Sequence, residues 1–269
     1  MQRIRMTTEY TEGTLAALLA TAKTGDIILL DEYQCSEMAG MSSGLVLRFG
    51  HEFSFVARRG ELCPLGEHVC TSWRIGDDGL YLNDGDRFTF LSVDGAKYDL
   101  GHHAFSTCRA SPAGLYIRRG NEFFRITPEG EEYSLGAYPC ISWEAGSGGI
   151  EFGLGKERFL LANDGVLHAL GQHCYGFIRV TPFATITVTE QWFRRLDDKG
   201  VQHSLGEHMF ERFDFGPKGL VIWRANEFFA VADDGREQSL GRARAEVWCA
   251  TPMGVCVRFR DELRLLVQK

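Results

Sequence analysis

The sequence predicts an all-β fold, a seven-bladed β-propeller with four short strands in each blade. Three observations lead to this prediction. Glycine, leucine and phenylalanine recur at a fixed spacing of 35 residues along nearly the whole chain. Each repeat divides at its glycines into four short apolar segments, a pattern typical of antiparallel hairpins. One repeat is split between the two ends of the chain, which is expected of a ring of blades that must hide its sheet edges.

Composition sets outer bounds on this prediction. The chain has 269 residues, of which 44% are hydrophobic, so a large core can form and disorder is excluded. No segment approaches the roughly 18 uninterrupted apolar residues of a membrane span. The N-terminus lacks the apolar segment of a signal peptide, so we expect a cytoplasmic protein. The net charge of -7 argues against nucleic acid or an anionic membrane as the main partner.

Residues 1–24 lie outside the repeats and are expected to form a helical extension. Residues 11–22 contain strong helix formers, with Leu15, Leu18 and Leu19 on one side and Thr11 as the cap. We interpret this segment as a short amphipathic helix docked on the repeats, and a helix that binds a partner is the alternative. The propeller domain is then expected to occupy residues 25–269.

Columns of matching residues define the repeats that follow. The opening glycine recurs at Gly44, Gly79, Gly114, Gly149, Gly219 and Gly254, with Ala184 in the remaining repeat. A turn glycine recurs from Gly25 to Gly235, and a leucine, usually followed by glycine, from Leu30 to Leu240. The resulting blades are 44–78, 79–113, 114–148, 149–183, 184–218, 219–253, and 254–269 joined with 25–43. We expect the split blade to take two strands from each end of the chain.

Residues 114–148 illustrate the strands expected within one blade. The four apolar segments are 115–118, 122–127, 132–135 and 140–144, and turns at Gly120 and Gly130 separate the first three. A helical repeat is disfavoured because the glycines interrupt every run long enough to form a helix. The repeat 184–218 departs furthest from the pattern, since it loses the opening glycine and gains several threonines.

In its Gly-Leu opening and its turn glycine, the repeat resembles those of the broad propeller class, and in particular the bacterial WG-type repeats. It departs from the WG pattern because the Trp-Gly pair is missing. It also lacks the Trp-Asp pair of WD repeats and the Gly-Gly pair of kelch repeats. The resemblance implies a rigid platform, and such a fold does not by itself specify an activity.

Histidines and cysteines, which can bind metals, are interpreted here as structural residues. One column holds His68, His103, His173 and His208, with Tyr33 and Tyr138 in two other repeats. Equivalent positions in neighbouring blades lie on the order of 10 Å apart, too far to share one zinc ion, so we expect each ring to bond a turn carbonyl. The eight cysteines are expected to be buried free thiols, with Cys63 and Cys70 as the one pair worth checking for a disulfide. We expect no metal and no cofactor.

Charge placement indicates a binding surface. In a four-stranded blade, the second turn and the linker between blades lie on one face, which here carries sixteen acidic residues against ten basic ones. We expect a basic protein partner to contact this face, because complementary charge orients and accelerates docking. The expected contact residues are Asp77, Asp78, Asp197, Asp198, Asp233 and Asp234, together with Trp192 and Trp223, which interrupt columns of other residue types. On the other face, Arg48, Arg118 and Arg258 are expected at the mouth of a central channel.

These features predict a non-enzymatic, protein-binding propeller that is monomeric outside its complex. A compact acidic propeller of this kind resembles some bacterial inhibitor and immunity proteins, which cover the active site of a toxin with a complementary surface. Two alternatives stay open. A carbohydrate-binding propeller would need exposed aromatic residues at repeated positions, and a channel-sited enzyme would act on a small molecule through Arg48, Arg118 and Arg258.

Overall fold

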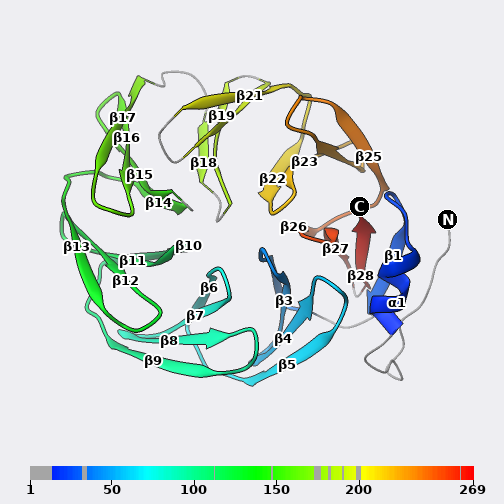
Figure 1. Cartoon of the computed structure of the whole chain (residues 1–269), viewed down its shortest axis with the longest axis horizontal. Coiled ribbons are helices and arrows are strands. Elements are labelled where there is room, and N and C mark those ends of the chain that lie inside the picture. The colour runs from blue at the N-terminus through cyan, green and yellow to red at the C-terminus, as the bar shows by residue number, and fades with distance from the viewer. Residues whose placement is uncertain are drawn as a thin grey trace. The chain divides into compact units, whose positions relative to one another are not determined.

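The computed structural model of the chain describes residues 14–31, 35–111, 113–146, 148–172, 177–180, 183–189, 191–197, 201–260 and 262–269. Over these residues, the strands form seven four-stranded antiparallel sheets, accompanied by the helix α1 (Thr14–Thr21) (Figure 1). This is the predicted seven-bladed β-propeller, with one blade built from both ends of the chain. No helix in the described part of the chain has the length and apolar character needed to cross a membrane.

Six sheets consist of four strands that follow one another along the chain. The first three sheets contain β2 (Glu37–Gly40), β3 (Gly44–Phe49), β4 (Glu52–Ala57) and β5 (Leu62–Glu67); β6 (Ser72–Ile75), β7 (Gly79–Asp84), β8 (Arg87–Ser92) and β9 (Lys97–His102); and β10 (Thr107–Ser111), β11 (Gly114–Arg119), β12 (Glu122–Ile126) and β13 (Glu132–Ala137). The next three contain β14 (Trp143–Gly146), β15 (Gly149–Leu154), β16 (Glu157–Ala162) and β17 (Leu167–Gln172); β18 (Phe177–Val180), β19 (Thr185–Thr189), β20 (Trp192–Leu196) and β21 (Gln202–Glu207); and β22 (Arg212–Gly216), β23 (Gly219–Arg224), β24 (Glu227–Val231) and β25 (Glu237–Arg242). The terminal sheet contains β1 (Ile27–Asp31), β26 (Val247–Thr251), β27 (Gly254–Phe259) and β28 (Glu262–Val267).

The sheets belong to two compact units, which are described separately. The first unit contains the β2–β5 sheet, the β22–β25 sheet and the terminal sheet, and in it β2 and β22 both pack against β26. The second unit runs from Val69 to His208 apart from Val93–Gly95, and it contains the other four sheets. Within it, the first strands β6, β10, β14 and β18 pack against one another in sequence.

The grouping of strands into sheets differs from the prediction by one strand. The first strand of each sheet is the segment that the prediction made the fourth strand of the preceding 35-residue unit. For example, β6 was predicted to end one blade and β7 to begin the next, but the two strands pair in one sheet. The terminal sheet has the order β1–β28–β27–β26, and the predicted division into two strands from each end is therefore wrong: three come from the C-terminal side and one from the N-terminal side. The physical reason is the tight turn that joins the first two strands of a sheet. At Asp77 and Asp78, the Gly76 N–H donates to the Gly79 carbonyl at 2.8 Å and β6 pairs with β7; in the terminal sheet, Thr251 pairs with Gly254 across the equivalent turn between β26 and β27.

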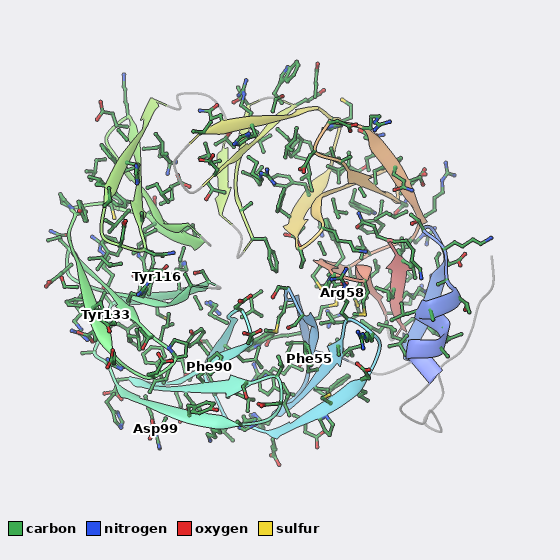
Figure 2. The ribbon with its side chains drawn as sticks, viewed as in Figure 1. Phe55, Arg58, Phe90, Asp99, Tyr116 and Tyr133 are labelled. Carbon is green, nitrogen blue, oxygen red and sulfur yellow. The ribbon has the colours of Figure 1, made fainter. Side chains whose placement is uncertain are left out.

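Where a repeat opens with glycine, that glycine begins the second strand of a sheet, and at Gly44, Gly79, Gly149 and Gly254 a side chain would not fit. A Cβ atom on Gly44 would lie 2.2 Å from the carbonyl oxygen of Val56, and one on Gly79 would lie 2.5 Å from that of Leu91. The rings of Phe55 and Phe90, labelled in Figure 2, lie against the same two glycines. Packing at the hairpin therefore explains this column of the sequence.

The Leu-Gly pair of the repeat forms a β-bulge in the fourth strand. In the β4–β5 pairing, Phe53 lies opposite Gly66 and Ser54 lies opposite Pro64, so one residue of β5 is unpaired. Gly66 has a φ of +88°, which glycine adopts without the steric penalty of a Cβ atom. The same register shift, with one unpaired residue, recurs in the fourth strands β9, β13, β17, β21 and β25. The bulge is thus a repeated feature that this column of the sequence encodes.

The phenylalanine column forms the core between neighbouring sheets of a unit. Phe123 of β12 is fully buried, and its ring packs edge-on against Trp143 at 5.2 Å and stacks on Phe152 at 5.9 Å. The ring of Phe228 meets Trp248 in the same edge-on way at 5.2 Å. The repeated tryptophans therefore serve packing.

Helix α1 docks on the terminal sheet as expected. Leu15 is only 6% exposed and belongs to the apolar cluster that contains Ile28 and Leu263, while Leu18 and Leu19 pack against the same cluster. The ammonium group of Lys269 donates to the carbonyl of Leu19 at 2.6 Å, near the C-terminal end of the helix, where cations are favoured. The predicted cap, Thr11, lies outside the described residues.

Candidate functional site

Each sheet has two ends with different side chains. The turns between the first and second strands and between the third and fourth strands lie at one end, here termed the acidic end; it is defined by Asp77, Asp78, Asp197, Asp233 and Asp234. The turn between the second and third strands and the connection to the next sheet lie at the other end, here termed the arginine end; it is defined by Arg48, Arg118, Arg224 and Arg258.

The aspartates of the acidic end lie in tight turns. Asp77, Asp78 and Asp233 are exposed to solvent. Asp234 is also exposed and accepts hydrogen bonds from the backbone N–H of Arg236 at 3.1 Å and from its Nε at 2.6 Å, so the guanidinium holds the pKa of this carboxyl below its usual range. The carboxylate of Asp197 accepts from the Val201 N–H at 2.8 Å and lies 3.1 Å from Nε2 of His203.

Further carboxylates reinforce the acidic end in the second unit. Glu129, Glu131 and Asp164 are exposed and occupy the third-to-fourth strand turns of two of its sheets. The residue predicted to lie beside Asp197, Asp198, falls outside the described residues. Within this unit, the acidic end thus presents carboxylates from several sheets.

The two tryptophans predicted to join these aspartates lie at the arginine end of their sheets. Trp192 is the first residue of β20 and Asp197 follows its last, which places them about 17 Å apart along the strand. Trp192 is 43% exposed. Trp223 pairs with Phe228 and packs on its ring at 6.1 Å, with the Arg212 guanidinium 5.8 Å from the Trp223 ring. Neither tryptophan can share one contact patch with the aspartates of its own sheet.

The three arginines predicted for a channel mouth bind groups of their own unit. Each is on the second strand of its sheet, one strand away from the first strands that pack together. Arg48 pairs with Glu37 at 2.9 Å, Arg118 donates to the Asn121 amide oxygen at 3.0 Å, and Arg258 donates to the Ser36 carbonyl at 3.0 Å. The partners of these three arginines therefore lie in or next to the segments that connect the strands.

The histidine column has the structural role expected of it wherever it is described. Nε2 of His68, His103 and His208 donates to the carbonyl of the leucine three residues earlier, at 2.9, 2.7 and 2.7 Å. Each ring also packs on the phenylalanine of its own sheet. The fourth member, His173, lies outside the described residues. Because these rings are held by backbone carbonyls, they tie the connecting segment to the bulge.

The described cysteines are free thiols, including the pair Cys63 and Cys70. Cys249 and Cys256 are buried beside each other in the terminal sheet, and burial raises the pKa of both thiols. The prediction of buried free thiols is confirmed for most of them, while Cys63 and Cys108 are only partly buried.

A buried polar cluster at β15 was not predicted from the sequence. Glu151 is 3% exposed, and among the residues that the structure describes, neither of its carboxylate oxygens has a hydrogen-bond partner. The nearest cation, Nη1 of Arg158, lies 3.7 Å away, and burial raises the pKa of Glu151 to about 7. A signal was present in the repeat: Glu151 occupies a column that holds Tyr81 and Tyr116 in other sheets, and Arg158 occupies the phenylalanine column.

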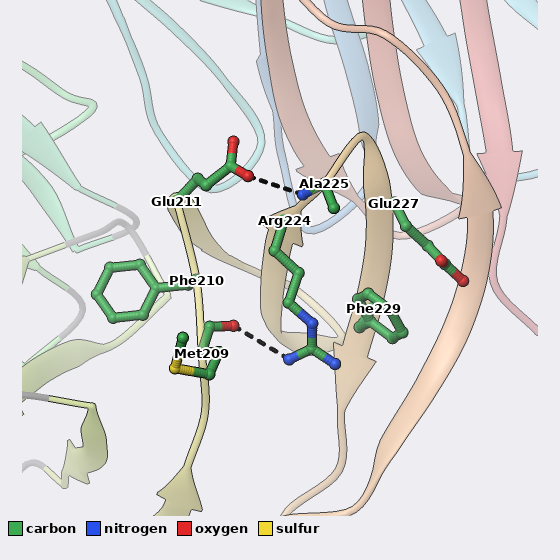
Figure 3. A pocket seen from close by; sticks show the side chains of 7 residues that line it. All are labelled: Met209, Phe210, Glu211, Arg224, Ala225, Glu227 and Phe229. Carbon is green, nitrogen blue, oxygen red and sulfur yellow. Dashed lines mark hydrogen bonds between the residues drawn. The ribbon is translucent and has the colours of Figure 1, made fainter.

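The turn between β23 and β24 was also missed. Ala225 and Asn226 have φ of 50° and 61°, in the left-handed region, where equivalent turns use Gly50, Gly85 or Gly120. Oε1 of Glu211 accepts a hydrogen bond from the Ala225 N–H at 2.8 Å. Together with the Met209–Glu211 connection, this turn borders a pocket of about 230 Å³ (Figure 3). The missing glycine in a repeated column was the signal that could have identified it.

Replacing Ala225 with glycine is expected to stabilise the protein by up to about 1 kcal/mol, because glycine removes the penalty of a Cβ atom at positive φ. The reciprocal change, Gly120→Ala, is expected to destabilise by a similar amount, since Gly120 has a φ of 60° and no atom of the described residues lies within 4 Å of the added Cβ. Urea unfolding of both variants measures the two changes. A loss of stability in Ala225→Gly would mean that packing of the methyl group outweighs its strain.

No family model matches the sequence, and no curated protein matches it either. Among solved structures, the WD40 domain of Neurospora crassa Pan2 is similar over 92% of this chain and 98% of that chain, with 10% identity and a TM-score of 0.55. Hsv2 of Kluyveromyces marxianus is similar over 84% of this chain and 89% of that chain, with 12% identity and a TM-score of 0.53. PorZ of Porphyromonas gingivalis aligns with 86% of this chain, which spans 34% of PorZ, with 12% identity and a TM-score of 0.42. Likeness to the first two, at this identity, is likeness of fold, and it agrees with a β-propeller.

Proposed function

We propose that residues 25–269 form one protein-binding propeller domain that docks a basic partner on its acidic ends. The observation that carries the proposal is that each unit has exposed carboxylates in tight turns: Asp77 and Asp78 in one unit, and Asp233 and Asp234 in the other. Complementary charge accelerates the encounter of two proteins and selects their orientation. The repeated phenylalanine column is buried and offers no surface to a carbohydrate, while Tyr98 of β9 and Tyr133 of β13 are exposed at equivalent positions.

The rigidity of these turns supports docking by surface occlusion. Asp77 and Asp78 occupy a two-residue hairpin turn closed by a backbone hydrogen bond, and Asp234 is tied to Arg236. A turn whose backbone is fixed before binding loses less entropy on binding, so more of the contact energy is retained as affinity. We therefore propose, as the specific form of this function, a bacterial immunity or inhibitor protein that covers the active site of a toxin in the cytoplasm.

The experiment measures a purified partner, isolated from the source organism with the tagged chain, by calorimetry in low and high salt. Two double variants, Asp77→Lys with Asp78→Lys and Asp233→Lys with Asp234→Lys, reverse the charge of the acidic ends. At least one is expected to raise Kd by about tenfold or more, and affinity is expected to fall with salt. The matched control is Glu52→Lys with Glu67→Lys, a cross-strand pair of exposed glutamates at the arginine end of the β2–β5 sheet.

Affinity that responds neither to salt nor to either double reversal would contradict docking on the acidic ends. The immunity form has its own readout, which is the enzymatic or toxic activity of the partner at equal molar ratio. Full activity of the partner in the complex would contradict that form and leave docking itself in place.

A further inference from the structure

We propose that the pocket beside Glu211 binds a lysine or arginine side chain of a partner protein. The pocket lies at the arginine end of the β22–β25 sheet, so it is separate from Asp233 and Asp234 at the other end of the same sheet. Its walls come from the Met209–Glu211 connection and from the segment between Arg224 and Phe229 (Figure 3). The inference rests on the proposed function, because it assumes a protein partner.

The charges around the pocket leave one carboxylate without a cation. The guanidinium of Arg224 is neutralised by Glu237, with Nη1 to Oε1 at 3.0 Å, and it also donates to the Met209 carbonyl at 3.1 Å. Glu227 accepts from Ser239 Oγ at 2.7 Å and from Arg242 Nε at 3.2 Å, so its charge is balanced as well. Within the described part of the chain, the one hydrogen bond to the carboxylate of Glu211 comes from a backbone N–H. The unbalanced charge at the pocket is therefore negative.

Glu211 is held in position before any ligand arrives. In the equivalent place of three other sheets, Ser36, Thr71 and Ser106 donate their hydroxyl groups to a carbonyl of the second strand, at 2.8, 2.8 and 2.9 Å. A carboxylate cannot donate, and Glu211 instead accepts from the Ala225 N–H in the strained turn (Figure 3). One oxygen is thus occupied by the turn while the other is available to a cation, in a geometry that the turn fixes.

The remaining walls match the stem of a long basic side chain. Met209 is 60% exposed, and its flexible thioether adapts to an aliphatic chain. Ala225 adds a methyl group where equivalent turns have glycine, and the ring of Phe229 lies under the Arg224 guanidinium at 4.2 Å. Lysine and arginine combine an apolar stem with a charged head. A pocket of about 230 Å³ is smaller than the roughly 300–1,000 Å³ of small-molecule sites, which favours a single side chain over a whole cofactor.

The test uses the full chain and three short capped peptides that differ only at the central residue, which is lysine, arginine or norleucine. Binding is followed by NMR through the backbone amide of Ala225 and the methyl group of Met209. The lysine and arginine peptides are expected to shift both signals in a saturable way, and the norleucine peptide is not. Glu211→Gln, which keeps an acceptor for the Ala225 N–H, is expected to weaken binding by about tenfold. The control, Glu52→Gln with Glu67→Gln at the arginine end of the β2–β5 sheet, is expected to leave the peptide affinity unchanged.

Equal binding of the norleucine peptide, or an unchanged affinity in a folded Glu211→Gln variant, would overturn the inference. Loss of peptide binding in the Glu52→Gln and Glu67→Gln variant would also overturn it, because the cation would then bind outside this pocket. Failure here is distinguishable from failure of the proposed function: the Ala225 and Met209 signals and the Glu211→Gln variant report on this pocket, whereas salt and charge reversal at the acidic ends report on docking of the whole partner.

Discussion

Replacing Glu151 with glutamine is expected to stabilise the protein by about 3 kcal/mol at pH 8 and to have little effect at pH 5. In the native protein, burial raises the pKa of Glu151 to about 7. The Arg158 guanidinium lowers this pKa by less than burial raises it, and the Glu144 carboxylate raises it further. The difference between this pKa and the pKa of a glutamate in the unfolded chain corresponds to about 3 kcal/mol of folding stability. Glutamine has the same shape and carries no charge, so this difference disappears in the variant.

The sign follows from which state binds the proton more tightly. The folded protein holds the Glu151 proton up to about pH 7, whereas the unfolded chain releases it near pH 4. This group therefore contributes its full stability below the unfolded pKa and loses it as pH rises through the folded pKa. Between about pH 5 and pH 8, the native protein is expected to become less stable relative to the glutamine variant.

Urea unfolding at pH 5, 7 and 8 measures the effect. The matched control is Glu157→Gln, an exposed residue on the adjacent strand β16, which is expected to follow the native protein at every pH. Parallel stability curves for the native protein and the Glu151→Gln variant would contradict the prediction, since they would mean that the carboxylate is already compensated in the folded state.

Replacing Phe123 with alanine is expected to destabilise the protein by about 3–5 kcal/mol. The ring is fully buried and is bordered by the rings of Trp143, Phe152 and Tyr138 at 5.2, 5.9 and 6.4 Å. Trp143 and Phe152 lie on the paired strands β14 and β15, and Tyr138 lies in the connection before β14, so strand pairing limits how far these rings can move into the space that the ring leaves. The loss therefore includes a cavity term in addition to the lost apolar burial.

The neighbouring residue provides the control for this substitution. Phe124 points to the opposite face of β12, is partly buried, and is covered by the Arg119 guanidinium at 4.4 Å. Phe124→Ala is expected to cost less than half as much, because solvent and the flexible arginine can fill the space. Equal losses in chemical unfolding of the two variants would show that strand pairing, rather than core packing, sets the stability of this sheet.

Most of the fold could be predicted because its determinants are local. The bulge requires a residue that tolerates positive φ, so Gly66 and its equivalents repeat every 35 residues, and the crowded hairpin explains Gly44 and Gly79 in the same way. Constraints of this kind act on single positions and are visible in a sequence compared with itself. The N-terminal helix was predictable for a similar reason, since Leu15, Leu18 and Leu19 share one side.

The boundaries of the blades could not be read from the repeat. A periodic sequence has no intrinsic starting point, and any four consecutive strands make an equally regular unit. The hydrogen bond between Gly76 and Gly79 places the Asp77-Asp78 turn within a sheet. The equivalent turn between Thr251 and Gly254 joins β26 to β27, so the terminal sheet has three strands from one end and one from the other. The predicted partition placed its boundary at the Asp77-Asp78 turn because that turn is rich in glycine.

The candidate binding residues were predictable in type but not in grouping. Aspartates in Asp-Gly and Asp-Asp turns are exposed wherever such turns occur, so Asp77, Asp78 and Asp233 were found from the sequence. Trp192 and Trp223 were placed with them because they deviate from their columns, yet a deviation does not tell at which end of a strand a residue lies. Antiparallel pairing decides that, and it places both tryptophans at the arginine end.

By itself, the sequence determined that this chain repeats a four-stranded unit, where its turns fall, and that acidic side chains concentrate in particular turns. These properties depend on the conformational preferences of single residues and on their spacing. The tertiary structure alone decided which strands share a sheet, that Glu151 is buried beside Arg158, and that Glu211 faces the strained turn at Ala225. Such relations join residues that are distant or differently oriented in the chain, and they arise only when packing brings the strands together.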